Sequence, residues 1–206
     1  MITCYIGTRA QLIKMAPVIL ELERRKVVIA LVMTGQHEET MRQLMDDFRI
    51  ASIPIYIYRG EEITGIVQMA RWFLGSLWKC LSAGDRFLPR STSRQDVVLV
   101  HGDTVSTLLG ALIGRIKGVK VAHIEAGLRS NNIFHPFPEE LTRLAVSRLS
   151  HLAFCPGVWA WNNLENYRMY RVDTQHNTLA EALQLALDTP KTDLSDSALS
   201  LPDCYG

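Results

Sequence analysis

The 206-residue sequence has almost no net charge, no closely spaced cysteines and no long apolar run free of polar residues. A net charge of +1, without blocks of like charge, gives no reason to expect a nucleic acid or another polyanion as a partner. The four cysteines are far apart and lack the spacing of metal ligands, so we expect reduced thiols in a cytoplasmic protein.

The sequence also has no segment typical of a membrane span or of a signal peptide. The most apolar stretch, residues 63–81, is interrupted by Gln68, Arg71 and Lys79, which argues against a membrane span. The first apolar run begins directly after Met1 and leaves no room for a signal peptide. No internal repeat is visible. The length fits one large domain, or one domain with a fragment of another.

Short apolar runs alternate with longer segments of helical period, the pattern of βαβ units in a parallel sheet. The expected strands are residues 2–6, 27–34, 53–58, 97–100, 119–124 and 152–155. The expected helices are residues 11–25, disturbed early by Pro17, and 39–48, 62–81, 104–117, 139–149, 158–166 and about 177–188. The apolar face of the helix at 62–81, flanked by Trp72 and Trp78, is expected to pack in the core. We therefore predict an α/β fold with a Rossmann-like parallel sheet and flanking helices.

Acidic residues directly follow two successive predicted strands. Asp103 lies in Val-His-Gly-Asp-Thr at 100–104, and Glu125 lies in Ala-His-Ile-Glu-Ala-Gly-Leu-Arg at 122–129. Because the carboxyl ends of parallel strands meet at one edge of a sheet, both carboxylates are expected in one crevice. Converging carboxylates suit general acid/base chemistry, since repulsion and burial separate their pKa values.

Glu139 and Glu140 begin a helix after Pro138, where an acid can serve simply as a partner of the helix dipole. We prefer that structural interpretation for Glu140. For Glu139, Arg143 one helical turn later favours a functional role, because Arg143 could pair with Glu139 or bind a phosphate.

Two histidines raise a metal hypothesis. His101 and His123 each lie two residues before one of the acids, and imidazole and carboxylate both bind divalent ions. Neither pair has a third ligand at short spacing, so we prefer packed, hydrogen-bonded histidines and expect no metal.

The turn Gly7-Thr8-Arg9 follows the first strand and opens a helix, where free N–H groups and the helix dipole favour an anion. Arg9 and Lys14 add positive charge nearby. The turn matches neither the Walker pattern nor Gly-x-Gly-x-x-Gly. We give about equal weight to two interpretations of this turn. One is a phosphate or diphosphate site, and the other is an ordinary tight turn with solvated Arg9 and Lys14.

Taken together, these motifs resemble the non-hydrolysing UDP-N-acetylglucosamine 2-epimerases. The matching segments follow the family's order over about residues 2–165: Gly7-Thr8-Arg9, Ile13-Lys14-Met15-Ala16-Pro17, Thr34-Gly35-Gln36-His37, His101-Gly102-Asp103-Thr104, residues 123–129 and residues 136–143. The resemblance implies one half of a glycosyltransferase-B-type fold, in which the substrate lies between two Rossmann-like domains. It also implies interconversion of UDP-N-acetylglucosamine and UDP-N-acetylmannosamine, by elimination of UDP to a 2-acetamidoglucal and re-addition. No cofactor is implied, because UDP is both leaving group and returning nucleophile.

The resemblance also implies roles for particular residues. Three carboxylates are the candidates for proton transfer and oxocarbenium stabilisation: Asp103, Glu125 and Glu139. Three basic residues would hold the diphosphate or orient the acids: Arg9, Lys14 and Arg143. Two residues match the region that in some members binds a second, activating UDP-N-acetylglucosamine: Gln36 and His37.

The sequence departs from the family pattern at several places. Ala10-Gln11 stands where Pro-Glu is common, Thr142 replaces the usual Asn, and the loop at 82–95 has no match. Most of the second domain is missing. We expect an N-terminal domain at 1–166, and at 167–206 a remnant of the second domain, with its predicted helix and a polar tail.

That missing domain would hold the uridine, much of the diphosphate and a catalytic histidine in this family. The resemblance therefore implies an epimerase that is impaired or inactive as this chain. The alternatives are a catalytically silent sugar-nucleotide binding or interaction module, and an internally deleted product. A transferase half-domain is disfavoured by the order of the acidic motifs. The implied partners are UDP-N-acetylglucosamine or UDP, with a homodimer or a separately encoded second half as further expectations.

Overall fold

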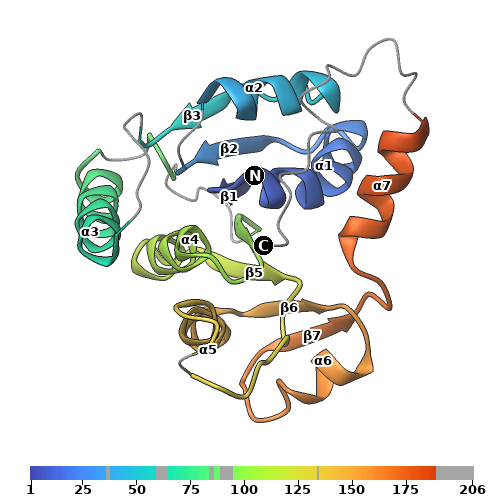
Figure 1. The fold of residues 1–206 in the computed structure, drawn as a ribbon. Helices are drawn as coiled ribbons and strands as arrows, with labels where there is room; N and C mark the ends of the chain where they lie inside the picture. Colours follow the sequence, from blue (N-terminus) through green and yellow to red (C-terminus); the bar gives the residue numbers. More distant parts are fainter. Residues whose placement is uncertain (36–37, 59–64, 84–85, 89–94, 134, 189–206) are drawn as a thin grey trace, which may run out of the picture.

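The computed structural model describes residues 1–35, 38–58, 65–83, 86–88, 95–133 and 135–188. Within these residues, seven parallel strands form one sheet in the order β3-β2-β1-β4-β5-β6-β7, with helices on both faces (Figure 1). The strands are β1 (Ile2–Ile6), β2 (Ile29–Met33), β3 (Pro54–Tyr56), β4 (Val97–His101), β5 (Lys120–Ile124), β6 (Leu152–Cys155) and β7 (Tyr170–Asp173). The helices are α1 (Arg9–Arg24), α2 (Glu38–Asp47), α3 (Ile66–Ser82), α4 (Val105–Ile116), α5 (Glu139–Leu149), α6 (Val158–Asn162) and α7 (Thr178–Asp188). The predicted Rossmann-like fold class is confirmed.

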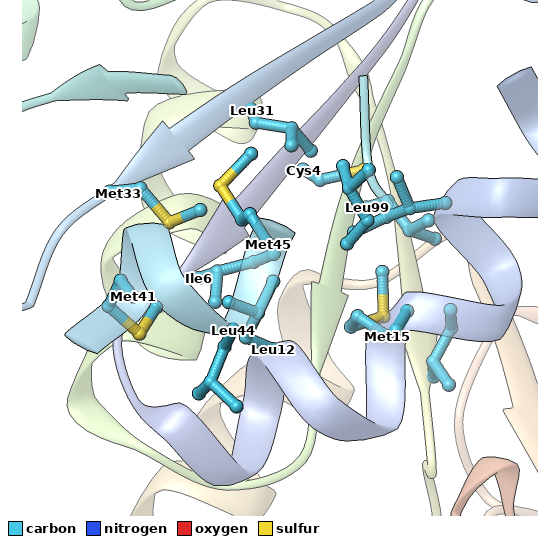
Figure 2. Close-up of a cluster of buried hydrophobic side chains, with 14 of the residues drawn as sticks. Cys4, Ile6, Leu12, Met15, Leu31, Met33, Met41, Leu44, Met45 and Leu99 are labelled. Carbon is cyan, nitrogen blue, oxygen red and sulfur yellow. The ribbon is translucent and has the colours of Figure 1, made fainter. Parts of the chain in front are cut away.

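Alternation along the strands divides the core between the two faces of the sheet, because successive side chains of a strand point to opposite sides. Cys4 and Ile6 of β1 pack with α1 and α2, where four buried methionines help fill the cluster (Figure 2). Tyr5, between them, points to the other face and packs with residues of α3, α4 and α5. Strands buried on both sides read as unbroken apolar runs, which is why they could be located in the sequence.

Residues 170–173 form a strand that the sequence analysis did not predict. β7 pairs in parallel with β6, from Leu152 opposite Tyr170 to Cys155 opposite Asp173, so the sheet continues beyond residue 166. The helix that follows, α7, packs against α1 (Figure 1). The origin of residues 167–206 in a second domain stays a prediction.

The interpretation of the helix at 62–81 as a buried stripe is wrong in part. Trp72, Phe73 and Leu77 of α3 do pack against the core. Five other large apolar side chains of the helix are exposed: Ile66, Val67, Leu74, Trp78 and Leu81. An apolar stripe on a helix indicates a face that tends to be buried. In this fold only part of α3 packs against the core, so the rest of its stripe is exposed.

Smaller differences concern helix limits. α6 ends at Asn162, four residues before the predicted limit, and α1 runs through Pro17 without interruption. The three cysteines in the described residues, Cys4, Cys80 and Cys155, are buried free thiols. None of the helices in the described part of the chain is both long and apolar enough to cross a membrane.

A candidate acid site at the carboxyl edge of the sheet

The turns after β1 and β2 and the start of α4 meet at one edge of the sheet. A Cβ atom on Gly35 would lie 1.7 Å from the carbonyl oxygen of Gly7, and one on Gly7 would lie 1.9 Å from Ser106 Oγ. Only glycine permits such close approach of two backbone segments. Asp103 and Glu125 follow β4 and β5 at the same edge, so the predicted placement of both acids at one edge of the sheet is confirmed.

Glu125 lies at the centre of this edge, directly after β5, with a left-handed φ of 60°. Its side chain is only 8% exposed, and Lys14 Nζ donates to both carboxylate oxygens at 2.9 Å. His101 Nε2 lies 3.1 Å from Oε2, and Asn177 Nδ2 donates to Oε1. Lys14 comes from α1 and Asn177 from the residue before α7, so three distant segments meet at this carboxylate.

Opposing effects act on the protonation of Glu125. Burial raises the pKa of the carboxyl, but the contacts with His101 and Lys14 lower it more, and the resulting pKa is about 2. Glu125 is therefore ionised throughout the neutral range, and a carboxylate with so low a pKa is a poor proton acceptor there. Its negative charge is the property that this arrangement preserves.

Asp103 is oriented by Arg143 rather than by a histidine. Arg143 Nε donates to Asp103 Oδ2 at 2.9 Å, and Nη2 donates to the same oxygen. Arg143 Nη1 in turn lies 3.3 Å from Glu140 Oε2. Asp103 keeps 27% of its side chain exposed, so it remains accessible to solvent.

Glu140 holds Arg143, the partner of Asp103, through a buried ion pair. Its side chain is fully buried, accepts the Ser130 N–H at 3.0 Å, and binds Arg129 and Arg143. Burial raises the pKa of Glu140, but its contacts with Ser130 and Arg129 outweigh burial and lower it overall. The preferred structural interpretation of Glu140 is supported, though two arginines, and not the helix dipole alone, are its partners.

Glu139 differs from the other two candidate acids. It is the first residue of α5, and its Oε2 is buried with no hydrogen-bond partner among the described residues. Arg143, considered as its partner in the sequence, pairs with Asp103 and Glu140 instead. Glu139 thus keeps a free lone pair at the same edge.

The basic residues predicted to bind a diphosphate have different positions. Lys14 and Arg143 are engaged with Glu125 and Asp103 and so orient acids. Arg9 is exposed at the first position of α1, and no partner for its side chain is found among the described residues. Gln36 and His37 lie outside the described residues.

Gln11 is a residue of the site that the sequence marked only as a departure from the family pattern. It is 3% exposed, and its Oε1 accepts the Gly7 N–H at 2.8 Å. Its Nε2 lies within 2.7 Å of the His101 carbonyl oxygen and 3.0 Å of Thr104 Oγ1. The side chain therefore joins the turn after β1 to the turn after β4, which carries Asp103.

Both histidines are buried, as preferred in the sequence analysis, but the predicted hydrogen bonding holds for His123 alone, because neither ring nitrogen of His101 has a hydrogen-bond partner among the described residues. His123 Nε2 lies 2.7 Å from the Gly102 carbonyl oxygen, and burial is the main cause that lowers the pKa of His123 to about 4. A neutral His123 can donate this hydrogen bond. No group of three or more metal-ligating side chains occurs among the residues the structure describes.

The fold and this edge together define a Rossmann-like protein with three carboxylates gathered at the carboxyl ends of its strands. The family model described as UDP-N-acetylglucosamine 2-epimerase matches residues 20–200. The UDP-N-acetylglucosamine 2-epimerase of Neisseria meningitidis is 36% identical over 189 residues, which cover 90% of this chain and 48% of that protein. The enzyme of that name from Bacillus subtilis is 35% identical over 182 residues, covering 86% and 45%. The chain belongs to the UDP-N-acetylglucosamine 2-epimerase family.

Solved structures give the same result. The crystal structure of the Neisseria meningitidis enzyme bound to UDP-GlcNAc has a TM-score of 0.74 and 33% identity, covering 90% of this chain and 48% of that one. The Staphylococcus aureus MnaA–UDP structure has a TM-score of 0.74 and 31% identity, covering 89% and 47%. The chain thus spans about half the length of the relatives it matches.

Proposed function

We propose that this chain supplies the acid-bearing half of a UDP-N-acetylglucosamine 2-epimerase site and acts with a second Rossmann-like domain in a glycosyltransferase-B-type arrangement. The observation that carries the proposal is the convergence of Asp103, Glu125 and Glu139 at one sheet edge with unlike partners. Family membership supports the substrate class.

The reaction requires both a proton-transfer group and fixed negative charge. Loss of the proton at C2 and cleavage of the C1–O bond to UDP give a C1=C2 double bond, and re-addition of UDP with protonation on the other face gives the epimer. Positive charge develops at C1 as the C1–O bond breaks, and preorganised carboxylates stabilise such charge. Asp103 and Glu125, each held by a cation, fit that electrostatic role.

Glu139 is our candidate for the group that accepts a proton. A base needs a free lone pair within reach of the proton, and Glu139 Oε2 has no competing donor in the described part of the chain. The lowered pKa of Glu125, by contrast, makes that carboxylate a poor proton acceptor near neutral pH.

The nucleotide would be held only weakly by this half. Arg9 and the first N–H groups of α1 offer one wall of a diphosphate site, open to water. An exposed ion pair contributes about 0–1 kcal/mol, whereas millimolar binding already requires about 4 kcal/mol. UDP should therefore bind to the 206-residue chain in the millimolar range or more weakly, and the chain alone should give no measurable epimer.

A fusion of this chain to the second half of the Neisseria meningitidis relative tests the proposal. The fusion should convert UDP-N-acetylglucosamine and exchange the C2 hydrogen with deuterated solvent. Asp103→Asn, Glu125→Gln and Glu139→Gln should each lower turnover by at least about a hundredfold. Glu165→Gln, which changes an exposed glutamate away from the site, is the control and should retain turnover.

Near-normal turnover in one acid variant would remove that residue from the catalytic set. A fusion that folds and binds UDP, yet shows neither conversion nor exchange, would favour the silent binding module over the enzyme. Robust exchange by the unfused 206-residue chain would show that this half needs no second domain.

A further inference from the structure

We infer that Asn177 is a positioning residue for Glu125, through which the helix α7 fixes the orientation and charge of this acid. The functional consequence rests on the proposed function, whereas the contact and its effect on Glu125 do not. The inference concerns a residue outside the acidic motifs, 52 positions away from Glu125 along the chain.

Hydrogen bonding determines which way the Asn177 amide faces. Its Oδ1 accepts the Leu179 N–H at 3.0 Å, as expected for the cap of a helix N-terminus. The amide nitrogen must then point the other way, toward Glu125 Oε1. A flipped amide would place its oxygen against the carboxylate and its nitrogen against a donor, which costs both bonds.

The position of Asn177 is itself fixed on two sides. Before it, Thr174 Oγ1 donates to the Cys155 carbonyl oxygen at 2.9 Å, which ties the segment to the end of β6. After it, α7 packs along α1, the helix that carries Lys14 (Figure 1). Lys14 in α1 and Asn177 directly before α7 therefore reach the carboxylate from two segments whose helices pack against each other.

The Asn177 amide is one of several groups around the Glu125 carboxylate. Lys14 from α1 and His101 from β4 contact the carboxylate. His123 on β5 and Asp103 after β4 are the other titratable groups that interact electrostatically in the same region. A donated N–H favours the charged form of a carboxyl group. Asn177 shares Oε1 with Lys14, so it restricts rotation of the carboxylate as well as stabilising its charge.

Two substitutions separate this role from the capping of α7. Asn177→Asp keeps a side chain that caps helices as well as asparagine does, but it replaces the donor with a negative charge beside Glu125. Asn177→Ser also keeps a capping oxygen, yet its side chain is too short to reach the carboxylate. Both variants should retain the far-UV circular dichroism of the parent chain.

The measurement is the titration of the Glu125 carboxyl carbon by NMR in the 206-residue chain. The pKa should rise by about one unit or more in Asn177→Asp, because a like charge disfavours ionisation. It should rise less in Asn177→Ser. Glu165→Gln, at an exposed position outside the contacts of Glu125, should leave it unchanged. An unchanged Glu125 titration in both folded Asn177 variants would overturn the inference.

Activity of the fusion protein adds a second readout. Asn177→Ser should lower kcat by about tenfold or more with little change in KM, and Asn177→Asp should shift the acidic limb of the pH–rate profile upward. If both variants keep parental kcat and pH profile, the inferred role in the reaction is wrong. If the parental fusion itself is inactive, the proposed function fails, while the NMR titration still decides whether Asn177 positions Glu125.

Discussion

The contacts of Glu125 with His101 and Lys14 should make the stability of this protein depend on pH in a way that Glu125→Gln removes. The pKa of Glu125 is lowered from its ordinary value of 4.5 to about 2 in the folded chain. A carboxyl whose pKa is lower when folded stabilises the fold at pH values above its unfolded pKa. That stabilisation is lost as the pH falls through the folded pKa.

The magnitude follows from the two pKa values. One pKa unit corresponds to 1.36 kcal/mol, so the contribution of Glu125 near neutral pH is about 3 kcal/mol. About 1.3 kcal/mol of it should disappear between pH 5.5 and pH 3.5, and most of the remainder by pH 2. The side chain is only 8% exposed, so solvent screening reduces this effect little.

Urea unfolding of the 206-residue chain, followed by circular dichroism at pH 5.5, 4.5 and 3.5, measures the effect. The difference in unfolding free energy between the parent and Glu125→Gln should shrink by about 1.3 kcal/mol over this range. Glu165→Gln, at an exposed position, should give a curve parallel to the parent. Parallel curves for parent and Glu125→Gln would refute the argument that the contacts with His101 and Lys14 lower the pKa of Glu125.

Other substitutions test the contacts around the site. Gly35→Ala should destabilise the chain by about 1–3 kcal/mol or more, because the new Cβ would lie 1.7 Å from the Gly7 carbonyl oxygen. Gly75→Ala, in the middle of α3 with nothing within 4 Å, should instead stabilise it by about 0.5–1 kcal/mol. Gln11→Met should cost about 1–3 kcal/mol, since the partly buried Gly7 N–H loses its acceptor. Urea unfolding at pH 7 measures all three, and a neutral Gly35→Ala or Gln11→Met would contradict the packing described.

The strand ends and their acids were predictable because a single rule connects them. Buried parallel strands read as apolar runs, and the residue after each run must lie at the carboxyl edge of the sheet. Asp103 and Glu125 could therefore be placed together from the sequence. β7 could not be located in this way, since its residues are exposed or only partly buried and give no apolar run.

The partners of the acids could not be predicted, because they come from remote segments. Lys14 and Glu125 are 111 positions apart, and Asp103 and Arg143 are 40 apart. Nothing in the local sequence distinguishes Arg143 as a partner of Asp103 rather than of Glu139, which lies one helical turn away. A pairing of this kind is determined by how α5 is rotated on the sheet, and rotation is a property of the packed structure.

The rotation of α5 on the sheet decides which of two adjacent glutamates at the start of the helix is buried. With 3.6 residues per turn, neighbouring side chains of a helix point about 100° apart. Glu140 is therefore buried with its arginines, while Glu139 keeps an unpaired oxygen. Rotating α5 about its axis by one residue position would carry Glu139 into the direction that Glu140 now takes, although every acid would still be present. The packing of Val146 and Leu149 against the core, which sets this rotation, is thus as much a part of the site as the carboxylates themselves.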